Sequence, residues 1–444
     1  MKTGTIYALA TAGGRAGIAV IRVSGDQAER ALIELCGGVP RPRLATRVLV
    51  RDPSTEEPLD EGLAIWFPQP ASFTGENVVE LHLHGGKAVV SGVLAALGKQ
   101  PEYRLADPGE FTRRAFENGK MDLTEVEGLA DLIDAETAAQ RRQALRQMGG
   151  ALGDIYDGWR TRLIGILAYF EASIDFSEED IPDNLVEQTQ RESLVLLSEV
   201  VSHLADGQRG ERLRDGVHVA ILGAPNAGKS SLLNLLAKRD AAIVSETAGT
   251  TRDIIEIQLD LAGYPVVLAD TAGIRRARDG VEKEGVRRAL GRAATVDLKI
   301  IVLETDEIDS EILDLVDADT LLLRNKIDCS PVVGGLTVNG IDAIGVSVKT
   351  GEGMGMFLQA LAEAVRSRFG LTEAALLTRA RHRQALEGCV GALRRAWPQS
   401  GAVGSPELVA EDLRLACRML GRITGRVDVE DLLDKIFSDF CIGK

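Results

Sequence analysis

The stretch VHVAILGAPNAGKSSLLNLLAK, residues 217–238, restricts the fold of this chain more than any other. An apolar run typical of a buried strand leads directly into residues 223–230, which match GxxxxGK[ST], and then into the apolar spacing of a helix. In such a loop glycines let backbone N–H groups face phosphate oxygens, Lys229 reaches the β- and γ-phosphates, and the Ser230 hydroxyl completes a Mg²⁺ shell. The stretch therefore predicts a phosphate-binding loop.

Two later segments predict that the nucleotide carries guanine. NKID at 325–328 follows the apolar strand TLLLR, and SVKTG at 347–351 can supply a backbone N–H to the guanine oxygen. Asp328 can accept both the N1–H and the exocyclic amine of guanine, two donors that adenine does not present in that arrangement. Adenine would leave a buried carboxylate unpaired, which penalises ATP. The residues alone predict a GTPase, in preference to an ATPase or a bare phosphate loop.

The segments between these motifs predict the metal site and the switches. DTAG at 270–273 ends an apolar strand, so Asp270 can hold Mg²⁺ through water and Gly273 can donate to the γ-phosphate. Within SETAGTTRD, 245–253, we assign Thr251 as the residue that closes over Mg²⁺. Ras-like enzymes place a water-orienting glutamine directly after DTAG, but Ile274 stands here and cannot polarise water. We expect another residue to orient water and another source of positive charge.

The pattern of apolar residues along the chain predicts an α/β domain inserted into a helical domain. Short β-branched runs (GIAVIRVSG, RVLVRD, GLAIWF, NVVELHLHGG) indicate a mixed α/β domain over 1–118. Helical spacing then runs through 119–213, broken by DIPDNL, with the second helical stretch expected to end near Asp206. Strands and helices alternate over 214–369, and helices return over 370–444. One helix is expected to bury the face formed by Leu152, Ile155, Trp159, Leu163, Ile166 and Phe170, and a later helix the face formed by Leu408, Val409, Leu413, Ala416 and Leu420. Gly421 or Gly425 can end this later helix. A last helix is expected to begin after Asp428, its predicted N-cap.

Composition excludes some classes of protein. The net charge of −15 disfavours a broad nucleic-acid surface, so any RNA contact should be local or supplied by a partner. No stretch approaches 18 consecutive apolar residues, and the start MKTGTIYALATAGG is too short and polar in its apolar part for export. Five dispersed cysteines without a CxxC spacing indicate free thiols and no disulfide framework or zinc site. We expect a cytoplasmic protein without a membrane anchor.

Along its whole length the chain resembles the bacterial tRNA modification GTPase family MnmE, also called TrmE. The resemblance rests on the nucleotide motifs with GTTRD, on FTGENVVELHLHGG, on DPGEFTRRAFENGKMDL and on the terminal CIGK. It implies an N-terminal tetrahydrofolate-binding domain, a helical domain split in sequence and an inserted Ras-like, doubly wound G domain. It also implies a homodimer that works with an FAD-containing partner, MnmG. Together they would add a carboxymethylaminomethyl or aminomethyl group at carbon 5 of the tRNA wobble uridine, using a one-carbon unit from 5-formyltetrahydrofolate or a related tetrahydrofolate.

The resemblance also implies ligands and catalytic residues. A K⁺ ion bound by Asn226, Ser245, Thr247 and Thr250 would take the place of an arginine finger when two G domains meet, and Glu282 would orient water. Without the resemblance, Glu282 reads as a solvated acid. Arg252 and Arg275 match family positions tied to the switches. The full set predicted to contact GTP and its ions is Asn226, Ala227, Gly228, Lys229, Ser230, Ser231, Ser245, Glu246, Thr247, Ala248, Gly249, Thr250, Thr251, Asp270, Thr271, Ala272, Gly273, Asn325, Lys326, Ile327, Asp328 and Ser347.

For the folate, the family contacts fall on Arg22, Glu80, Lys120 and Lys444. Pterin rings present paired donors to a carboxylate, and glutamate tails suit Arg or Lys. Arg22 and Lys120 read equally well as surface charges.

The terminal CIGK fails as a prenylation box, because glycine replaces the second aliphatic residue and lysine is not an accepted last residue. Cys441 is either an apolar residue at a helix end, behind Phe437 and Phe440, or a thiol directed at the folate and tRNA site. The resemblance favours the thiol and leaves open whether it reacts or shapes the pocket.

The sequence leaves two alternative functions. An Era-like regulatory GTPase of ribosome assembly should carry a basic appended domain, whereas this chain is acidic overall and ends in CIGK, which favours tRNA modification. A folate enzyme with a vestigial G domain would not keep all the nucleotide motifs.

Overall fold

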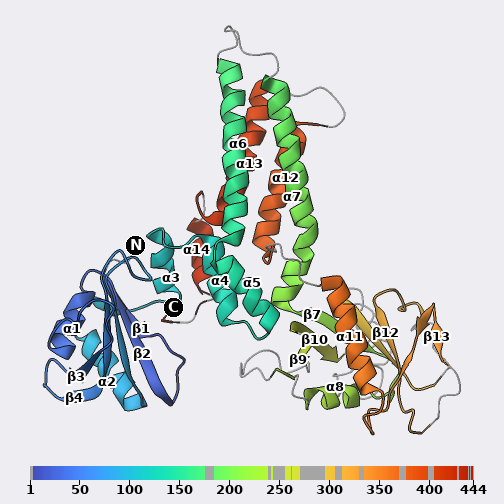
Figure 1. Cartoon of the computed structure of the whole chain (residues 1–444), viewed down its shortest axis with the longest axis horizontal. Coiled ribbons are helices and arrows are strands. Elements are labelled where there is room, and N and C mark those ends of the chain that lie inside the picture. Colours follow the sequence, from blue (N-terminus) through green and yellow to red (C-terminus); the bar gives the residue numbers. More distant parts are fainter. Residues whose placement is uncertain are drawn as a thin grey trace, which may run out of the picture. The chain divides into compact units, whose positions relative to one another are not determined.

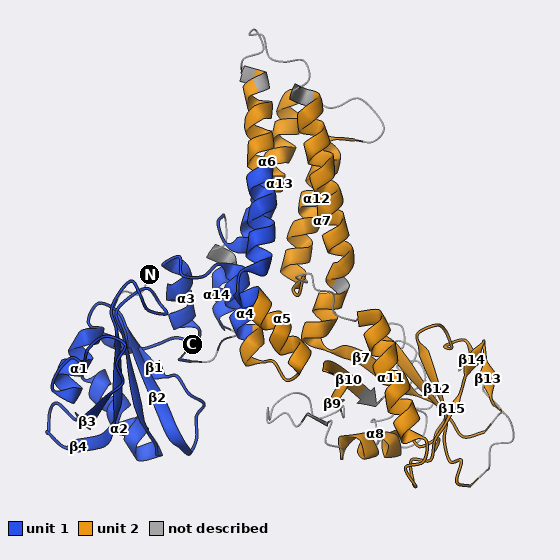
Figure 2. Ribbon diagram, viewed as in Figure 1, with its two compact units in different colours: residues 1–130, 147–162, 417–444 blue, residues 131–146, 163–416 orange. Residues whose placement is uncertain are grey.

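The computed structural model describes residues 4–175, 185–238, 242–243, 256–261, 263–270, 296–305, 313–329, 335–369, 377–398, 405–427, 430–438, 440 and 442–443. The chain divides into two compact units. Unit 1 comprises Met1–Ala130, Gln147–Arg162 and Cys417–Lys444, and unit 2 comprises Asp131–Arg146 and Leu163–Ala416 (Figure 2). Each unit therefore draws on segments far apart in the sequence.

Unit 1 contains a six-stranded sheet in the order β3-β4-β5-β2-β1-β6. All neighbours are antiparallel except β1 and β6, which are parallel. The helices α1 (Ala28–Cys36) and α2 (Lys87–Gly98) pack on one face, where Leu32, Leu35, Val93 and Leu97 join Ile21, Val23 and Leu81 in one apolar cluster (Figure 1). The predicted mixed α/β class is confirmed. The strands are β1 (Thr5–Leu9), β2 (Ala16–Ser24), β3 (Thr46–Arg51), β4 (Pro58–Phe67), β5 (Val78–Gly85) and β6 (Tyr103–Leu105).

The opposite face of this sheet is only partly covered. Helix α3 (Glu110–Glu117) inserts Phe111, which packs with Ile6 and Ala8 of β1 and with Phe73. Side chains alternate between the two faces of a strand, so Arg22 and Glu80, whose neighbours along β2 and β5 lie in the apolar cluster, point to this second face. The face leaves polar side chains within reach of solvent.

The remaining helices of unit 1 form a second, smaller core. Leu123 and Val126 of α4 (Leu123–Ile133) pack with Leu433 and Phe437 of α14 (Glu430–Ser438) and with Phe440. Helix α13 (Pro406–Thr424) ends before Gly425, not at Gly421. Gly425 has φ +87°, and a Cβ there would lie 2.7 Å from the Phe116 ring and 2.8 Å from Leu123. Only glycine combines that backbone with so close an approach.

The helices α6 (Ala151–Asp175), α7 (Leu185–Asp215) and α13 follow the predicted spacing with three differences. On α6 the expected face is buried, except that Ile155 is half-buried. Helix α7 runs nine residues past the expected end at Asp206. It continues because Gly207 packs tightly against Leu377, 3.1 Å from where a Cβ would stand, and because Leu213 is buried under the second sheet. Leu408 was wrongly placed in the buried stripe of α13, since it is 63% exposed while Val409 beside it is buried.

Unit 2 also contains a seven-stranded sheet in the order β15-β12-β11-β7-β10-β9-β8. The strands β10, β7, β11, β12 and β15 are parallel, whereas β9 is antiparallel to β10 and to β8. Helices α8 (Lys229–Ala237) and α11 (Met354–Phe369) cover one face. The predicted doubly wound class is confirmed. The strands are β7 (Val217–Leu222), β8 (Ala242–Ile243), β9 (Glu256–Leu261), β10 (Tyr264–Asp270), β11 (Leu298–Leu303), β12 (Thr320–Arg324) and β15 (Ile344–Gly345), beside a separate hairpin of β13 (Thr337–Val338) and β14 (Ile341–Asp342).

Two further helices lie mainly in unit 2. Helix α5 (Ala138–Met148) begins against the second sheet, and α12 (Ala380–Ala396) runs beside α7 (Figure 1). None of the described helices combines the length and the hydropathy needed to cross a bilayer.

Candidate functional site

The nucleotide motifs meet at one edge of the seven-stranded sheet. Because β7, β10, β11, β12 and β15 are parallel, their carboxyl ends lie along the same edge. Gly223 follows β7, Asp270 ends β10, Asn325 follows β12 and Ser347 lies two residues after β15. Ligands of open α/β sheets bind at this edge, where strand order reverses. The described parts of four motifs that span more than 120 residues of sequence are thus brought together.

The loop after β7 has the backbone of a phosphate cradle. Gly223 has φ +141° and Gly228 has φ +104°, and a Cβ on Gly228 would lie 2.1 Å from the Asn325 side chain. Asn226 is also left-handed, with φ +66°. Helix α8 begins at Lys229, so its first N–H groups and the positive end of its dipole face the loop. The loop fits the phosphates of a nucleotide.

Lys229 already lies over this loop. Its ammonium donates to the carbonyl oxygens of Gly223 at 2.8 Å and Ala224 at 2.7 Å, and the residue is only 9% exposed. A buried ammonium needs such acceptors, and phosphate oxygens can replace them when a nucleotide binds. Ala227, Ser230 and Ser231 sit beside it, in the loop and the first turn of α8.

Asn325 joins three parts of the site. Its amide nitrogen donates to the Ala227 carbonyl at 2.8 Å, and its amide oxygen accepts from the Val348 N–H at 3.2 Å. The residue is 4% exposed. One buried amide therefore ties the phosphate loop to the segment predicted to contact guanine.

Asp328, the predicted contact to guanine, is hydrogen-bonded to Ser347. Ser347, fully buried, donates its hydroxyl to Asp328 at 2.7 Å and accepts the Thr350 N–H at 3.2 Å. The Ser347 hydrogen bond holds the pKa of Asp328 below its ordinary value, so the carboxylate stays ionised. Lys326 instead pairs with Glu304 at 2.6 Å, and the N–H of Ile327 donates to Val346.

Several predicted residues lie outside the described part of the chain. Asp270 ends β10 in register with Ile221, beside the strand that leads to the phosphate loop. Asn226 is the predicted K⁺ ligand within the described residues. The predicted residues outside them are Ser245, Glu246, Thr247, Ala248, Gly249, Thr250, Thr251, Arg252, Thr271, Ala272, Gly273, Arg275, Glu282, Cys441 and Lys444.

The N-terminal candidates Arg22 and Glu80 meet on the open face of the first sheet. They are register partners on β2 and β5, and Arg22 donates to one Glu80 oxygen at 2.8 and 3.0 Å. The other oxygen lies 3.3 Å from the His82 imidazole. The Arg22 guanidinium also stacks over Phe73 at 5.3 Å and Phe111 at 5.7 Å. The side chains of Arg22 and Glu80 are 20% and 19% exposed, so neither is an ordinary surface charge.

Lys120 and the described end of the chain lie on segments that adjoin this pair. Lys120 donates to the Pro70 carbonyl at 3.1 Å, in the loop that carries Phe73. Gly443 has φ +98°, and a Cβ there would stand 2.1 Å from the Leu9 carbonyl. Leu9 follows Ala8, which is the register partner of Arg22. The chain end therefore returns to the strand beside Arg22.

Comparison with known proteins now decides the family. A family model described as the MnmE helical domain matches residues 123–441, and one described as the GTP-binding protein TrmE N-terminus matches residues 5–120. The chain belongs to the MnmE family. The match covers both the first sheet and the helices that flank the inserted sheet.

Full-length relatives agree with this assignment. The chain is 58% identical over 445 residues to the tRNA modification GTPase MnmE of Parvibaculum lavamentivorans, covering 99% of this chain and 100% of the relative. Proteins of the same name from Paramagnetospirillum magneticum and Rhodospirillum rubrum are 54% and 52% identical, over 99% and 100% of both chains. The whole chain, not one domain, is of MnmE type.

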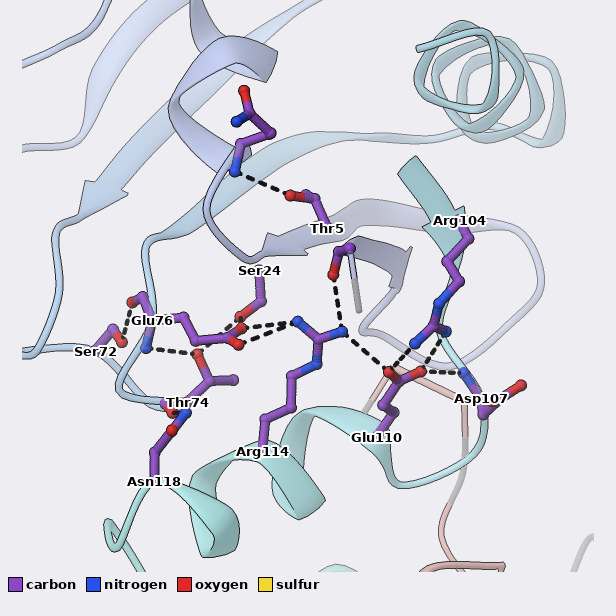
Figure 3. A network of polar contacts seen from close by, with 12 residues as sticks. Thr5, Ser24, Ser72, Thr74, Glu76, Arg104, Asp107, Glu110, Arg114 and Asn118 are labelled. Atoms are coloured by element: carbon purple, nitrogen blue, oxygen red, sulfur yellow. Dashed lines mark hydrogen bonds and ion pairs between the residues drawn. The ribbon is translucent and has the colours of Figure 1, made fainter. Parts of the chain in front are cut away.

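In this MnmE-family chain a polar network that sequence reasoning missed supports the N-terminal site (Figure 3). Arg114 of α3 donates to both Glu76 oxygens at 3.2 and 3.0 Å, to the Gly4 carbonyl at 2.9 Å and to Glu110 at 3.1 Å. Glu76 also accepts from Ser24 at 2.7 Å, and Asn118 donates to the Thr74 carbonyl at 2.8 Å. The network fixes the loop that carries Phe73 against α3 and β2.

The network contains charged side chains, and these lower the pKa of one carboxyl group, that of Glu110. Burial alone would raise the pKa of Glu110, but the Arg104 hydrogen bond, the Asp107 N–H and the Arg114 charge outweigh it and lower the pKa. The signal in the sequence was the spacing of Glu110 and Arg114, four residues apart in DPGEFTRR. That spacing reads equally well as an exposed helix pair, so it did not identify Glu76 as a partner.

Proposed function

We propose that this chain hydrolyses GTP and uses the hydrolysis to drive modification of tRNA. The observation that carries the proposal is the Asn325 bridge, because it binds the phosphate loop and the guanine segment into one site within an MnmE-family chain. GTP hydrolysis and tRNA modification are what the family's name states.

The described residues have distinct tasks in hydrolysis. The backbone of the loop and Lys229 hold the β- and γ-phosphates, and Asp328 with Ser347 selects guanine. Ser230 and Asp270 would hold Mg²⁺, with Thr251 closing over it. Bound Mg²⁺ neutralises charge on the phosphate oxygens. The chain needs no covalent intermediate, since positioning and charge suffice for phosphoryl transfer.

We further propose that two G domains pair across the nucleotide. Asn226, Ser245, Thr247 and Thr250 would bind K⁺, and Glu282 would orient the attacking water, with Arg252 and Arg275 tied to the switches. A K⁺ ion there supplies the positive charge that an arginine finger gives elsewhere. Two features support this proposal. Asn226 is held in a left-handed turn at the open end of the phosphate loop, and Ile274 stands where a glutamine would orient water.

The N-terminal face is proposed to bind a tetrahydrofolate. Glu80 offers a carboxylate to pterin donors, and Arg22 and Lys120 offer cations to the carboxylates of the ligand, with Lys444 and Cys441 from the chain end. The support is the half-buried Arg22–Glu80 pair beside two aromatic rings. A bound tetrahydrofolate supplies the one-carbon unit.

The proposed division of labour follows the predicted domains. Residues 1–118 bind folate, 119–213 and 370–444 form the split helical domain, and 214–369 form the G domain. The full enzyme is proposed to be a cytoplasmic homodimer that acts with the FAD-containing MnmG. It adds an aminomethyl or carboxymethylaminomethyl group at carbon 5 of the wobble uridine.

Mass analysis of tRNA tests the proposal. A strain that lacks this chain should lose the carbon-5 group from its wobble uridines, and the intact chain should restore it. Lys229→Ala, which removes the phosphate contact, should not restore it. Unmodified wobble uridines even with the intact chain would contradict the proposal. If wobble uridine is normal in the deletion strain and ribosome assembly fails, the Era-like function is favoured.

A further inference from the structure

An inserted domain is linked to its host by two chain connections and by the contacts around them. In unit 2 the seven-stranded sheet is entered from Asp215, the last residue of α7, through Gly216 into β7. On the return side the described chain resumes at Leu377 and enters α12 at Ala380. We expect a conformational change that the nucleotide causes in the G domain to be transmitted through these two connections.

One carboxylate joins both connections. Asp131, in the last turn of α4, accepts from Arg214 at 2.9 Å and from Arg379 at 2.6 Å through the same oxygen. Arg214 precedes the entry by one residue, and Arg379 stands at the start of the return helix. The side chains of Asp131 and Arg379 are 13% and 18% exposed. Such shielding strengthens the charge pairing and makes its geometry count.

The start of α5 makes a second contact at the same place. Thr137 and Gln140 form a capping box, in which each side chain accepts the backbone N–H of the other. The Gln140 amide then donates to the Arg214 carbonyl at 3.1 Å. The first turn of α5 is therefore fastened to the residue that Asp131 binds.

Helix α5 also touches the nucleotide sheet itself. The Ala139 N–H donates to the Gly263 carbonyl at 3.2 Å, and the fully buried Ala139 side chain belongs to the core of that sheet. Gly263 opens β10, and the other end of the same strand is Asp270, the candidate Mg²⁺ residue. A seven-residue strand is stiff and spans about 20 Å. A shift at the nucleotide edge thus reaches the first turn of α5 along one strand.

A cavity beside Asp131 and Arg214 leaves room for these side chains to take a second arrangement. A cavity of about 100 Å³, lined by Asp134, Gln143, Leu213 and Thr378 among others, adjoins Asp131 and Arg214. Fully packed cores resist small movements, whereas polar side chains next to a cavity can exchange partners. Helix α4 begins at Leu123, which packs with Phe437 and Phe440 shortly before Cys441. The helix that ends at the joint therefore begins beside the last helix of the chain.

From these contacts we propose that Asp131 is a positioning residue that couples the nucleotide state of the G domain to the modification chemistry. It touches neither GTP nor Mg²⁺ and acts by holding Arg214 and Arg379 together. The proposal rests on the proposed function, in which the two activities reside in one chain. The ion pairs of Asp131 with Arg214 and Arg379, which we call the ion-pair joint, are proposed to be needed for tRNA modification and not for the rate of GTP hydrolysis.

Asp131→Asn tests the proposal in the full-length chain, with Asp134→Asn as the matched control on the same segment. For Asp131→Asn we expect GTP hydrolysis within about threefold of wild type, and wobble-uridine modification at least about tenfold lower, within the usual range of coupling between sites. Asp134→Asn, which changes another residue beside the cavity, should keep both. Equal losses of both activities, or a loss of neither, would overturn the proposal. If Asp131→Asn does not fold, Arg379→Gln carries the same test.

A second measurement does not depend on tRNA. Hydrogen exchange in the last turn of α4, which Asp131 joins to Arg214 and Arg379, should differ between GDP and a non-hydrolysable GTP analogue in the wild-type chain. Asp131→Asn should abolish that difference. If the wild-type chain failed to modify tRNA but showed the difference, the proposed function would be wrong, and only the transmission of the nucleotide state out of the G domain would stand. If the wild-type chain showed no nucleotide-dependent difference, the coupling itself would be wrong.

Discussion

The buried amide group of Asn325 joins two segments of the candidate nucleotide site. It donates to the carbonyl of Ala227 in the phosphate loop and accepts from Val348 in the guanine segment, while Gly228 leaves just enough room for it. Removing the side chain would leave a buried carbonyl and a buried N–H without these partners. Each such group costs about 1–3 kcal/mol.

Asn325→Ala should therefore weaken GDP binding by at least roughly 5- to 150-fold, the affinity change that corresponds to about 1–3 kcal/mol for one of the two unpaired groups. A titration with a fluorescent guanine nucleotide measures the change. Asn118→Ala is a matched control, because it also removes one amide-to-carbonyl hydrogen bond but lies in the N-terminal network. It should leave the affinity unchanged. Wild-type affinity in Asn325→Ala would show that the bridge does not organise the site.

The Asp328–Ser347 contact predicts a pH dependence. A free aspartate titrates near 3.9, and Ser347 lowers the pKa of Asp328 below its ordinary value. The ionised form that accepts from guanine is thus complete above the ordinary pKa and is lost as pH falls through the lowered one. Ser347→Ala removes the largest cause of the shift. GDP affinity should be flat from about pH 6 to pH 8 in both proteins and should begin to fall at a higher pH in Ser347→Ala.

Circular dichroism at each pH separates this titration from acid unfolding. If the two affinity curves coincide, the hydroxyl does not hold the carboxylate ionised.

Sequence patterns predicted elements well where a motif and an apolar period coincided. The strand–loop–helix around Lys229 and the four N-terminal strands needed only local information, because apolar residues with a period of two or 3.6 must find a core. The end of α7 was missed because Gly207 reads as a stop, whereas in the fold it lets Leu377 approach. Leu408 was misplaced because neighbouring leucine and valine positions fit the same stripe about equally well. Glu76 and Arg114, and likewise Asp131 and Arg379, are too far apart in sequence for any local pattern to pair them.

Helix α3 offers a test of an element's attachment, since it carries two neighbouring arginines in different settings. Arg114 is 11% exposed and binds Glu76, Glu110 and Gly4, whereas Arg113 is 37% exposed and pairs with Glu117 and the open Asp434. Arg114→Met should lower the local stability of the N-terminal sheet by about 3–5 kcal/mol, because it leaves the half-buried Glu76 carboxylate without its cation. Arg113→Met should cost about 1 kcal/mol or less.

Hydrogen exchange of peptides from β1 and β5 reports these opening free energies. Similar losses in the two variants would mean that the polar network does not hold α3 to the sheet.

At the scale of the whole molecule, the proposed pairing brings together two copies that each carry a net charge of −15. Like charges repel, and added salt of any kind screens them. Ionic strength alone can therefore promote pairing, and a comparison of salts is informative only at equal ionic strength. What distinguishes K⁺ from Na⁺ is the fit of the ion to its ligands, which are local oxygens and not the field of the whole protein.

The potassium proposal then makes a sharp prediction. GTP turnover should be at least about tenfold faster in KCl than in NaCl at equal ionic strength, because the ion stands in for an arginine finger. Light scattering with GDP and aluminium fluoride should show dimers in KCl and monomers in NaCl.

Asn226→Gly removes the amide oxygen but keeps a backbone suited to the observed φ of +66°. It should retain GDP affinity and lose the advantage of KCl. Glu282→Ala should still bind GDP and lose most turnover in either salt. A chain that stayed monomeric in both salts and turned over GTP equally in both would contain no such site, and hydrolysis would then need a positive charge from another source.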